Sequence, residues 1–147
     1  MFQKIGGNIF YLGPIGSGQL LKMCNNIVVA NTTVALAEAF TIAAKAGVSP
    51  KTVFDIFKVS TANSRALELY GKLMVEGSTE ETSFACKHMC KDVNLFIDLA
   101  NDLKTPVLLS GLTHHIYNAA VLKGYGNFDN AAACKVVEEL TEQKIAN

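Results

Sequence analysis

Hydrophobic residues recur along most of this chain at intervals of three and four positions, the spacing of helices that bury one face. The longest such segment runs from Gln19 to Ala46 and contains no proline, no glycine and only three charged residues. It predicts one long helix, with Gly47 as the residue that ends it. Because its apolar positions lie on nearly every side, this helix must be covered by several neighbours.

Shorter helices are predicted after the long one, separated by turn and cap residues. Ser49 and Pro50 suit the N-cap and the first position of a helix that ends near Ser60. A polar loop at 76–83 and the pair Thr105-Pro106 separate later helices. The further expected ranges are about 66–74, 85–103, 105–123 and 131–140, the last with Ala131, Val136, Val137 and Leu140 facing inward.

The start of the chain is rich in turn residues and adds no sheet to the predicted helices. Residues 8–12 are strand-like and lead into a glycine-rich turn at 13–18. One strand cannot form a sheet by itself. The sequence therefore predicts a single all-α domain, a bundle of about six helices around the long one.

Composition narrows the possible partners. The chain has 147 residues, half of them apolar, which suffices for one domain with a core. Its 13 basic and 13 acidic side chains cancel, so no long-range field attracts nucleic acid or an anionic membrane. The uncharged run from Met23 to Ala37 is shorter than the about 20 apolar residues of a membrane span. We therefore expect neither nucleic acid nor a membrane as a partner.

The cysteines and the first residues of the chain indicate in which cellular compartment the protein is found. The cysteines lie in apolar or helical stretches without the spacing of a disulfide scaffold, which indicates reduced thiols. Residues 1–7 have neither an apolar signal-peptide core nor an Arg-rich amphipathic pattern. We expect a cytoplasmic protein, or one of the mitochondrial matrix if the source is eukaryotic. The four thiols are Cys24, Cys86, Cys90 and Cys134.

The candidate chemistry centres on Lys22 and Asn26, which are four residues apart and share one face of the predicted long helix. A partly buried lysine near the positive end of a helix releases its proton more readily than a solvated one, which suits acid–base catalysis. Asn26 offers a donor and an acceptor one turn away to orient the lysine or a substrate. The structural alternative is a lysine that extends from the helix start into solvent beside an asparagine.

Two weaker patterns lie in the turns. The spacing Gly13-x-x-Gly16-x-Gly18 differs from the dinucleotide fingerprint G-x-G-x-x-G, and no second strand ending in an acidic residue follows. A complete dinucleotide site within this chain is therefore not expected. Ser60 and Ser64 could contact a substrate at a helix break, although helix capping is the ordinary role of such residues.

Histidine and cysteine residues do not form a convincing metal site. Cys86, His88 and Cys90 are metal-ligand types, but on a helix His88 points away from both cysteines. We therefore expect buried, inert thiols and no metal. The side chains of His114 and His115 also point in different directions on a helix, so one should face solvent while the other is buried in the core.

Two motifs make the sequence resemble the β-hydroxyacid dehydrogenases. Residues 13–26, a glycine-rich turn followed by Lys22 and Asn26, are similar to the interdomain catalytic motif of that family. Residues 84–95 resemble the family's stretch in which a phenylalanine precedes a Lys-Asp pair. The resemblance covers essentially the whole chain and continues through residues 123–129.

The resemblance implies a two-domain enzyme. In such enzymes an N-terminal Rossmann domain binds NAD or NADP, and a helical domain like that of 6-phosphogluconate dehydrogenase closes over the nicotinamide. In that picture Lys22 gives a proton to the carbonyl oxygen during reduction or takes the hydroxyl proton during oxidation. Asn26 then positions Lys22 and the substrate. The implied substrate is a small hydroxyacid or semialdehyde, with 3-hydroxyisobutyrate favoured over tartronate or succinic semialdehyde.

Further site residues follow from the same resemblance. It places Lys91 near the cofactor or the substrate carboxylate and Phe84 at the nicotinamide. It also places the backbone of Ser17 and Gly18 near the substrate. Taken without the family, the pair Lys91-Asp92 would be interpreted as a solvated charge pair on a helix, which contributes little.

The chain departs from the family because the cofactor domain is not part of it. We expect residues 1–16 to be an interdomain segment and residues 17–147 to be the helical substrate and dimerisation domain. We also expect this chain alone to be inactive, and its long helix to form a homodimer or a higher oligomer. The competing hypothesis is a non-catalytic helical oligomerisation module with a vestigial site. The presence of both Lys22 and Lys91 argues against that alternative.

Overall fold

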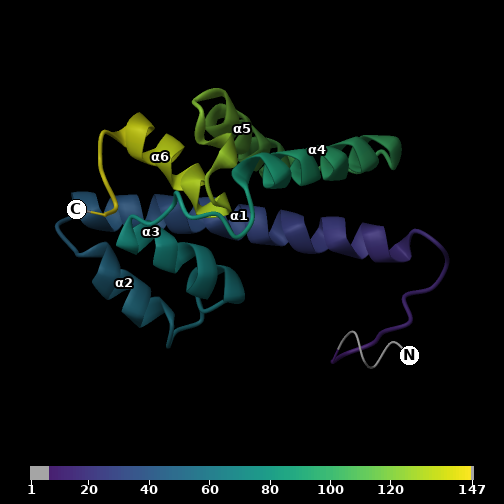
Figure 1. Ribbon diagram of the computed structural model, residues 1–147, viewed down its shortest axis with the longest axis horizontal. Helices are drawn as coiled ribbons and strands as arrows, with labels where there is room; N and C mark the ends of the chain where they lie inside the picture. The colour runs from purple at the N-terminus through teal and green to yellow at the C-terminus, as the bar shows by residue number, and fades with distance from the viewer. Residues whose placement is uncertain (1–6, 147) are drawn as a thin grey trace.

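One long helix carries the rest of the molecule. The computed structural model describes residues 7–146, within which all regular elements are helical and the one β-contact is an isolated bridge between Ala85 and Asp129. The all-α prediction is therefore confirmed. In Figure 1, α4, α5 and α6 lie on one side of α1, and α2 and α3 lie on the other. The elements are α1 (Ser17–Lys45), α2 (Pro50–Phe57), a π-helical turn η2 (Leu67–Gly71), α3 (Lys72–Glu76), α4 (Cys86–Asp102), α5 (Leu108–Leu122), two 3-10 turns η3 (Tyr125–Asn127) and η4 (Asn130–Ala132), and α6 (Ala133–Thr141).

The two ends of α1 are set by glycines in the left-handed region. Gly16 before the helix has φ 99°, and Gly47 after it has φ 80°, a conformation that a side chain disfavours. The predicted end at Gly47 is confirmed. By length and composition alone α1 could also cross a membrane, and 44% of its most apolar stretch is buried inside this chain. From the sequence, a membrane span was excluded because the uncharged run is short, but α1 is longer than that run, so its length does not exclude a span. The buried positions of α1 are explained by packing in the core.

The core consists of two clusters that share α1. One joins α1 to α4, α5 and α6, and the other joins the C-terminal half of α1 to α2, η2 and α6. Small side chains allow the close approach of these elements, since Ala30 and Ala37 of α1 are completely buried. Residues 131–133 are likewise buried alanines, so the chain can cross the core at η4.

The strand-like run does not form a strand. Residues 8–12 have no regular structure, and Phe10 and Tyr11 are 76% and 93% exposed. The physical reason is that residues 7–146 contain no second strand to pair with this segment. Part of the predicted interdomain segment, residues 1–6, lies outside the described residues.

Three details of the helices differ from the prediction. The helix expected at 66–74 is divided into η2 and α3. The helix expected from Thr105 begins at Leu108, because Lys104 has φ 52° and Pro106 disfavours a helical residue before it. Leu140 is 73% exposed instead of facing inward. By contrast, Ser49 and Pro50 begin α2 as expected.

Candidate active site

Asp92 joins the predicted site residues into one polar cluster. Its carboxylate is only 4% exposed and lies 3.2 Å from Lys22 Nζ and 2.6 Å from Lys91 Nζ. Asn26 Nδ2 donates a hydrogen bond of 2.8 Å to the same carboxylate. The structure thus brings together Lys22 and Asn26 from α1 with Lys91 from α4. We call these four residues the Asp92 cluster.

The cluster forms where α1 and α4 pack side by side. Lys22 and Asn26 are one turn apart on α1, so both reach the same side of the helix. Asp92 lies between Met89 and Phe96 on the face of α4 that packs into the core. A carboxylate at such a position requires partners, because burying an unpaired charge is costly.

The electrostatics of Asp92 follow from these partners. Burial raises the pKa of its carboxyl group, but the hydrogen bonds from Lys91, Lys22 and Asn26 outweigh that effect. The net result is a pKa below the ordinary value, so Asp92 is ionised at neutral pH. The pair Lys91-Asp92 is therefore not the solvated charge pair that the residues alone indicate.

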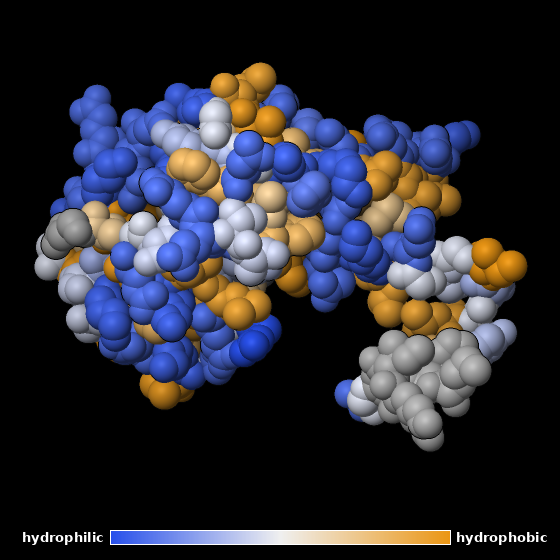
Figure 2. All heavy atoms as spheres, in the orientation of Figure 1, coloured by the Kyte–Doolittle hydropathy of each residue, from blue (hydrophilic) through white to orange (hydrophobic). Residues whose placement is uncertain are grey.

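Lys22 is less buried than the sequence led us to expect. Its side chain retains 60% exposure, so the expected partial burial is wrong for this chain. The reason is that α4 covers only one side of the first turns of α1, where Leu20 and Leu21 are also exposed. Figure 2 shows apolar side chains gathered at this end of the molecule. Lys22 is presented to solvent with its carboxylate partner behind it.

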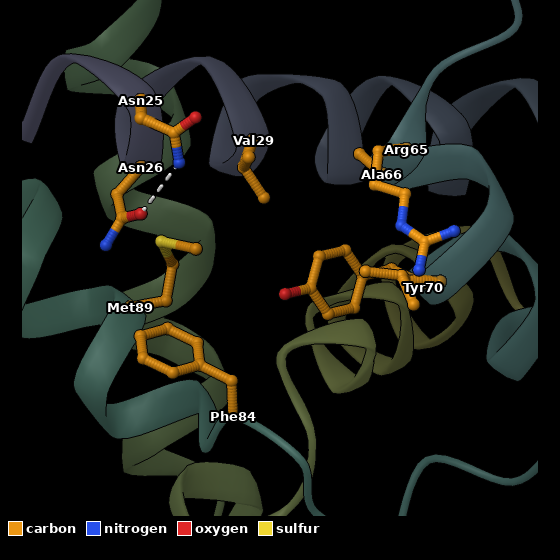
Figure 3. A pocket seen from close by; sticks show the side chains of 9 residues that line it. Asn25, Asn26, Val29, Arg65, Ala66, Tyr70, Phe84 and Met89 are labelled. Atoms are coloured by element: carbon orange, nitrogen blue, oxygen red, sulfur yellow. Dashed lines mark hydrogen bonds between the residues drawn. The ribbon is translucent and has the colours of Figure 1, made fainter. Parts of the chain in front are cut away.

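A cavity of about 350 Å³ lies beside the Asp92 cluster. Asn26 and Phe84 line one wall, and residues around η2 line the other (Figure 3). Most of its lining is apolar. The lining residues are Asn25, Asn26, Val29, Arg65, Ala66, Leu69, Tyr70, Phe84 and Met89.

Of the predicted site residues, Asn26 and Phe84 line this cavity, others line a more open hollow, and Lys91 lines neither. Lys22 and Gly18 line the hollow, and Asn25 lines both. Ser17 is the first residue of α1 and lines neither. The predicted residues therefore share one region of the surface without all facing one enclosed space.

Asp129 holds Phe84 at the cavity. Its completely buried carboxylate accepts hydrogen bonds from the backbone N–H groups of Ser83 and Phe84 and from the Ser83 hydroxyl. The Phe84 carbonyl in turn accepts a 2.8 Å hydrogen bond from the Asn130 N–H group. These bonds fix the segment that enters α4, since each backbone group there has a defined partner.

The weaker patterns behave as the structural alternatives predicted. Cys86 and Cys90 are buried while His88 is exposed, and no cluster of metal-binding side chains occurs among residues 7–146. Burial, followed by the charges of Cys90 and Asp129, raises the pKa of Cys86 to about 12, so this thiol is not reactive at neutral pH. His115 is exposed and His114 partly buried.

The two serines act as local hydrogen-bonding groups. Ser60 Oγ donates to the Phe57 carbonyl, and Ser64 Oγ accepts from the Leu67 N–H group at 3.0 Å. For Ser64 this is the capping role that such residues usually have, whereas Ser60 bonds the carbonyl of the last residue of α2.

Sequence reasoning missed three residues of this region. Asp92 could have been found, because it is a charged residue on the otherwise apolar face of its helix. Arg65 and Tyr70 could not be found, because hydrophobic periodicity does not predict the π-helical turn that contains Tyr70 and follows Arg65.

Comparison with known proteins assigns the family. Residues 16–137 match the family described as "NAD-binding of NADP-dependent 3-hydroxyisobutyrate dehydrogenase". The chain belongs to this family. The resemblance to the hydroxyacid dehydrogenases is thus confirmed, and the expected cofactor, NAD or NADP, agrees with the family assignment.

Several relatives share this domain. The chain is 29% identical over 145 residues to mouse mitochondrial 3-hydroxyisobutyrate dehydrogenase, which covers 95% of this chain and 43% of the mouse protein. It is 30% identical over 146 residues to the 2-hydroxy-3-oxopropionate reductase of Escherichia coli, covering 99% of this chain and 50% of the reductase. A structure of 3-hydroxyisobutyrate dehydrogenase from Mycobacterium tuberculosis with L-serine superposes with a TM-score of 0.80, at 27% identity over 90% of this chain and 47% of that one. The chain therefore spans half or less of each relative.

The cavity suits one part of a nicotinamide cofactor. Val29, Phe84 and Met89 offer apolar walls for a flat ring, and the amide of Asn26 offers hydrogen bonds. Residues 7–146 contain no strand–turn–helix unit that could hold the phosphates. These residues thus fit the nicotinamide end, while the rest of a dinucleotide needs another binding surface.

Proposed function

We propose that this chain is the helical catalytic half of an NAD(P)-dependent 3-hydroxyacid dehydrogenase. The favoured substrate is 3-hydroxyisobutyrate or a related hydroxyacid or semialdehyde. The observation that carries the proposal is the Asp92 cluster, in which a buried carboxylate holds a lysine and an asparagine beside an apolar cavity. The names of the two relatives, a hydroxyacid dehydrogenase and a reductase of a related aldehyde, support the substrate class.

In this proposal Lys22 is the proton-transfer group. During oxidation it takes the proton of the substrate hydroxyl, and during reduction it returns a proton to the carbonyl oxygen. Asp92 holds the lysine side chain at 3.2 Å. Asn26 is fixed between the same carboxylate and Asn25, whose Nδ2 group donates a 3.2 Å hydrogen bond to the Asn26 amide oxygen. A bound nicotinamide would supply the hydride acceptor or donor. Phe84 and Lys91 are the residues we assign to cofactor binding, and Gly18 and Ser17 to the substrate.

The exposure of Lys22 bears on the activity of this chain alone. A proton-transfer group works best where water is excluded, because charges then interact strongly. Here the lysine is 60% exposed, so we expect turnover only when a cofactor-binding domain covers it. The absence of a dinucleotide-binding unit among residues 7–146 leads to the same expectation.

The test is a dehydrogenase assay of the natural full-length protein that contains this sequence, with NAD and with NADP. The substrates are 3-hydroxyisobutyrate and a panel of small hydroxyacids and semialdehydes. Lys22→Ala should lower kcat by about 10²–10⁴-fold, the usual contribution of a positioned proton-transfer group. Lys45→Ala, at the other end of the same helix, is the matched control and should leave the rate unchanged. If both variants retain full activity, Lys22 is not the catalyst, and absence of any turnover would favour the non-catalytic oligomerisation module.

We further propose a homodimer formed through α1. Leu21, Val28, Ala35 and Ile42 are spaced by seven residues and all lie exposed along the helix. Apolar residues at this spacing form a stripe that is typical of helix–helix contacts between subunits. The uncovered side chains are large, since Val28 is 64% and Ile42 is 66% exposed.

Val28→Glu tests the dimer. A charge in the middle of the stripe should raise the dimer dissociation constant by at least tenfold, because it must be desolvated in the interface. Sedimentation velocity over a concentration series measures this change. Val59→Glu, at an 88% exposed position outside α1, is the control and should not alter association. A monomeric unsubstituted protein, or an unchanged dimer in Val28→Glu, would contradict the assignment.

A further inference from the structure

The cavity has a polar group at each of two opposite walls. Asn26, tied to the Asp92 cluster, lies on the wall made by α1 and α4, and Arg65 lies on the facing wall that precedes η2 (Figure 3). Between them the lining is mostly apolar. A ligand whose reacting end is at Asn26 therefore extends its other end toward Arg65.

Arg65 is the one arginine among the 13 basic residues of the chain. Arginine differs from lysine because its planar guanidinium binds carboxylates and phosphates through two parallel hydrogen bonds. It is half of an exposed ion pair, in which Nη1 donates a 2.8 Å hydrogen bond to Glu68. The other nitrogens, Nη2 and Nε, remain available, and an anion would have to compete with only one carboxylate.

Tyr70 adds a second donor on the same wall. Its hydroxyl points into the cavity (Figure 3). Burial, followed by the charge of Asp129, raises the pKa of this hydroxyl, so it keeps its proton and can donate a hydrogen bond. Tyr70 lies in the π-helical turn Leu67–Gly71, and Arg65 comes two residues before this turn. Both line the same cavity, and such turns often occur at functional sites.

We infer that Arg65 binds an anionic group at the end of the ligand that lies away from Lys22, and so determines which ligands the cavity accepts. This inference rests on the proposed function for its assignment of the reacting end. The anionic group is a second carboxylate of the substrate. Glu68 competes with this carboxylate for Arg65.

The test is a binding titration of this chain followed by nuclear magnetic resonance. Because Arg65 is the sole arginine, the protein gives a single arginine side-chain signal to follow. The probes are 3-hydroxyisobutyrate with one carboxylate, 3-hydroxyglutarate with two, and inorganic phosphate. The variants are Arg65→Gln and Glu68→Gln, with Lys51→Gln as a control for loss of an exposed ion pair elsewhere.

We expect 3-hydroxyglutarate to bind about five- to tenfold more tightly than 3-hydroxyisobutyrate and to shift the Arg65 signal. Arg65→Gln should abolish this preference, Glu68→Gln should increase it, and Lys51→Gln should leave it unchanged. A stronger shift with inorganic phosphate than with 3-hydroxyglutarate would overturn the assignment to a substrate carboxylate, and a stronger shift with 3-hydroxyglutarate would support it.

Equal binding of the one- and two-carboxylate acids, or an Arg65 signal that none of the three probes shifts, would overturn the inference. An unchanged preference in Arg65→Gln would do the same. Because the titration requires no hydride transfer, its outcome is independent of the Lys22 assay. If Arg65→Gln loses the preference for the two-carboxylate acid while Lys22→Ala keeps full activity, the anion site at Arg65 is supported and Lys22 is rejected as the catalyst.

Discussion

Replacing Asp92 by asparagine perturbs the polar cluster with almost no change in side-chain volume. The carboxylate now satisfies three donors, from Lys22, Lys91 and Asn26. In Asp92→Asn the charge is lost and only one of the two oxygens remains as an acceptor, so the donors that meet the other position face an N–H₂ group that cannot accept their hydrogen bonds. We therefore expect the variant to fold but to be less stable and to leave Lys22 without a fixed position.

The size of the effect follows from burial. A hydrogen bond to a charged group contributes about 1.5–3 kcal/mol, and that range applies to the bond from Asn26. The two lysine side chains are 60% and 58% exposed, so solvent screening reduces each ion pair to about 0–1 kcal/mol. Together these contributions give an expected loss of about 1.5–5 kcal/mol in the free energy of unfolding. For a domain of this size, each kcal/mol corresponds to a fall in Tm of about 2–4 °C.

The pH dependence of this loss provides a second test. The folded pKa of Asp92 lies below its ordinary value of 3.8, so the unfolded state binds the proton more readily than the folded state. The stabilisation by Asp92 is therefore complete above about pH 5 and is lost as the pH falls through the folded pKa. Urea unfolding of the unsubstituted protein and Asp92→Asn should differ at pH 7, and the difference should shrink below pH 3.8.

Asp98→Asn is the matched control, since Asp98 is on the same helix and exposed. It should change the free energy of unfolding by less than about 0.5 kcal/mol. The reasoning would be refuted if Asp92→Asn were as stable as this control. The reasoning would also be refuted if the difference in stability between the unsubstituted protein and Asp92→Asn stayed constant down to about pH 3. That result would show that the carboxylate charge does not stabilise the cluster.

Two further predictions concern the core and the thiols. Asp129→Asn should cost about 3 kcal/mol or more in urea unfolding, because the buried carboxylate accepts several hydrogen bonds that an amide cannot all replace; the exposed Asp55→Asn is the control, and equal stability of the two variants would contradict this role. In the native protein a thiol reagent at neutral pH should modify Cys24 alone, because the other three thiols are buried. Burial raises the pKa of Cys90, and it raises the pKa of Cys86 and of Cys134 to about 12. All four thiols should react in urea, and rapid native labelling of more than one would show that the core is open.

The helices were predictable because their signals are local. The long helix is ended by Gly47, and Ser49 with Pro50 begins the next one, so glycine, proline and periodicity determine both boundaries. The strand-like residues 8–12 show the limit of such signals. A strand needs a partner, and the local pattern does not reveal whether one exists.

The site was predictable in part. Lys22 and Asn26 are related by helical spacing, which the sequence shows directly. Their partner Asp92 is distant in sequence, and its burial depends on how α1 and α4 pack. The exposure of Lys22 has the same origin, because it depends on what covers the first turns of α1. Arg65 lines the same cavity as Asn26, although the two residues are distant in sequence.

The most direct test of the account is the rate of hydride transfer in a single turnover of the natural full-length protein. The enzyme, saturated with NAD or NADP, is mixed with 3-hydroxyisobutyrate, and the reduced nicotinamide is followed by its absorbance. We predict that Lys22→Ala slows this step by about 10²-fold or more, while Lys45→Ala leaves it unchanged. An undiminished rate in Lys22→Ala would contradict the central claim that Lys22, held by Asp92, transfers the proton.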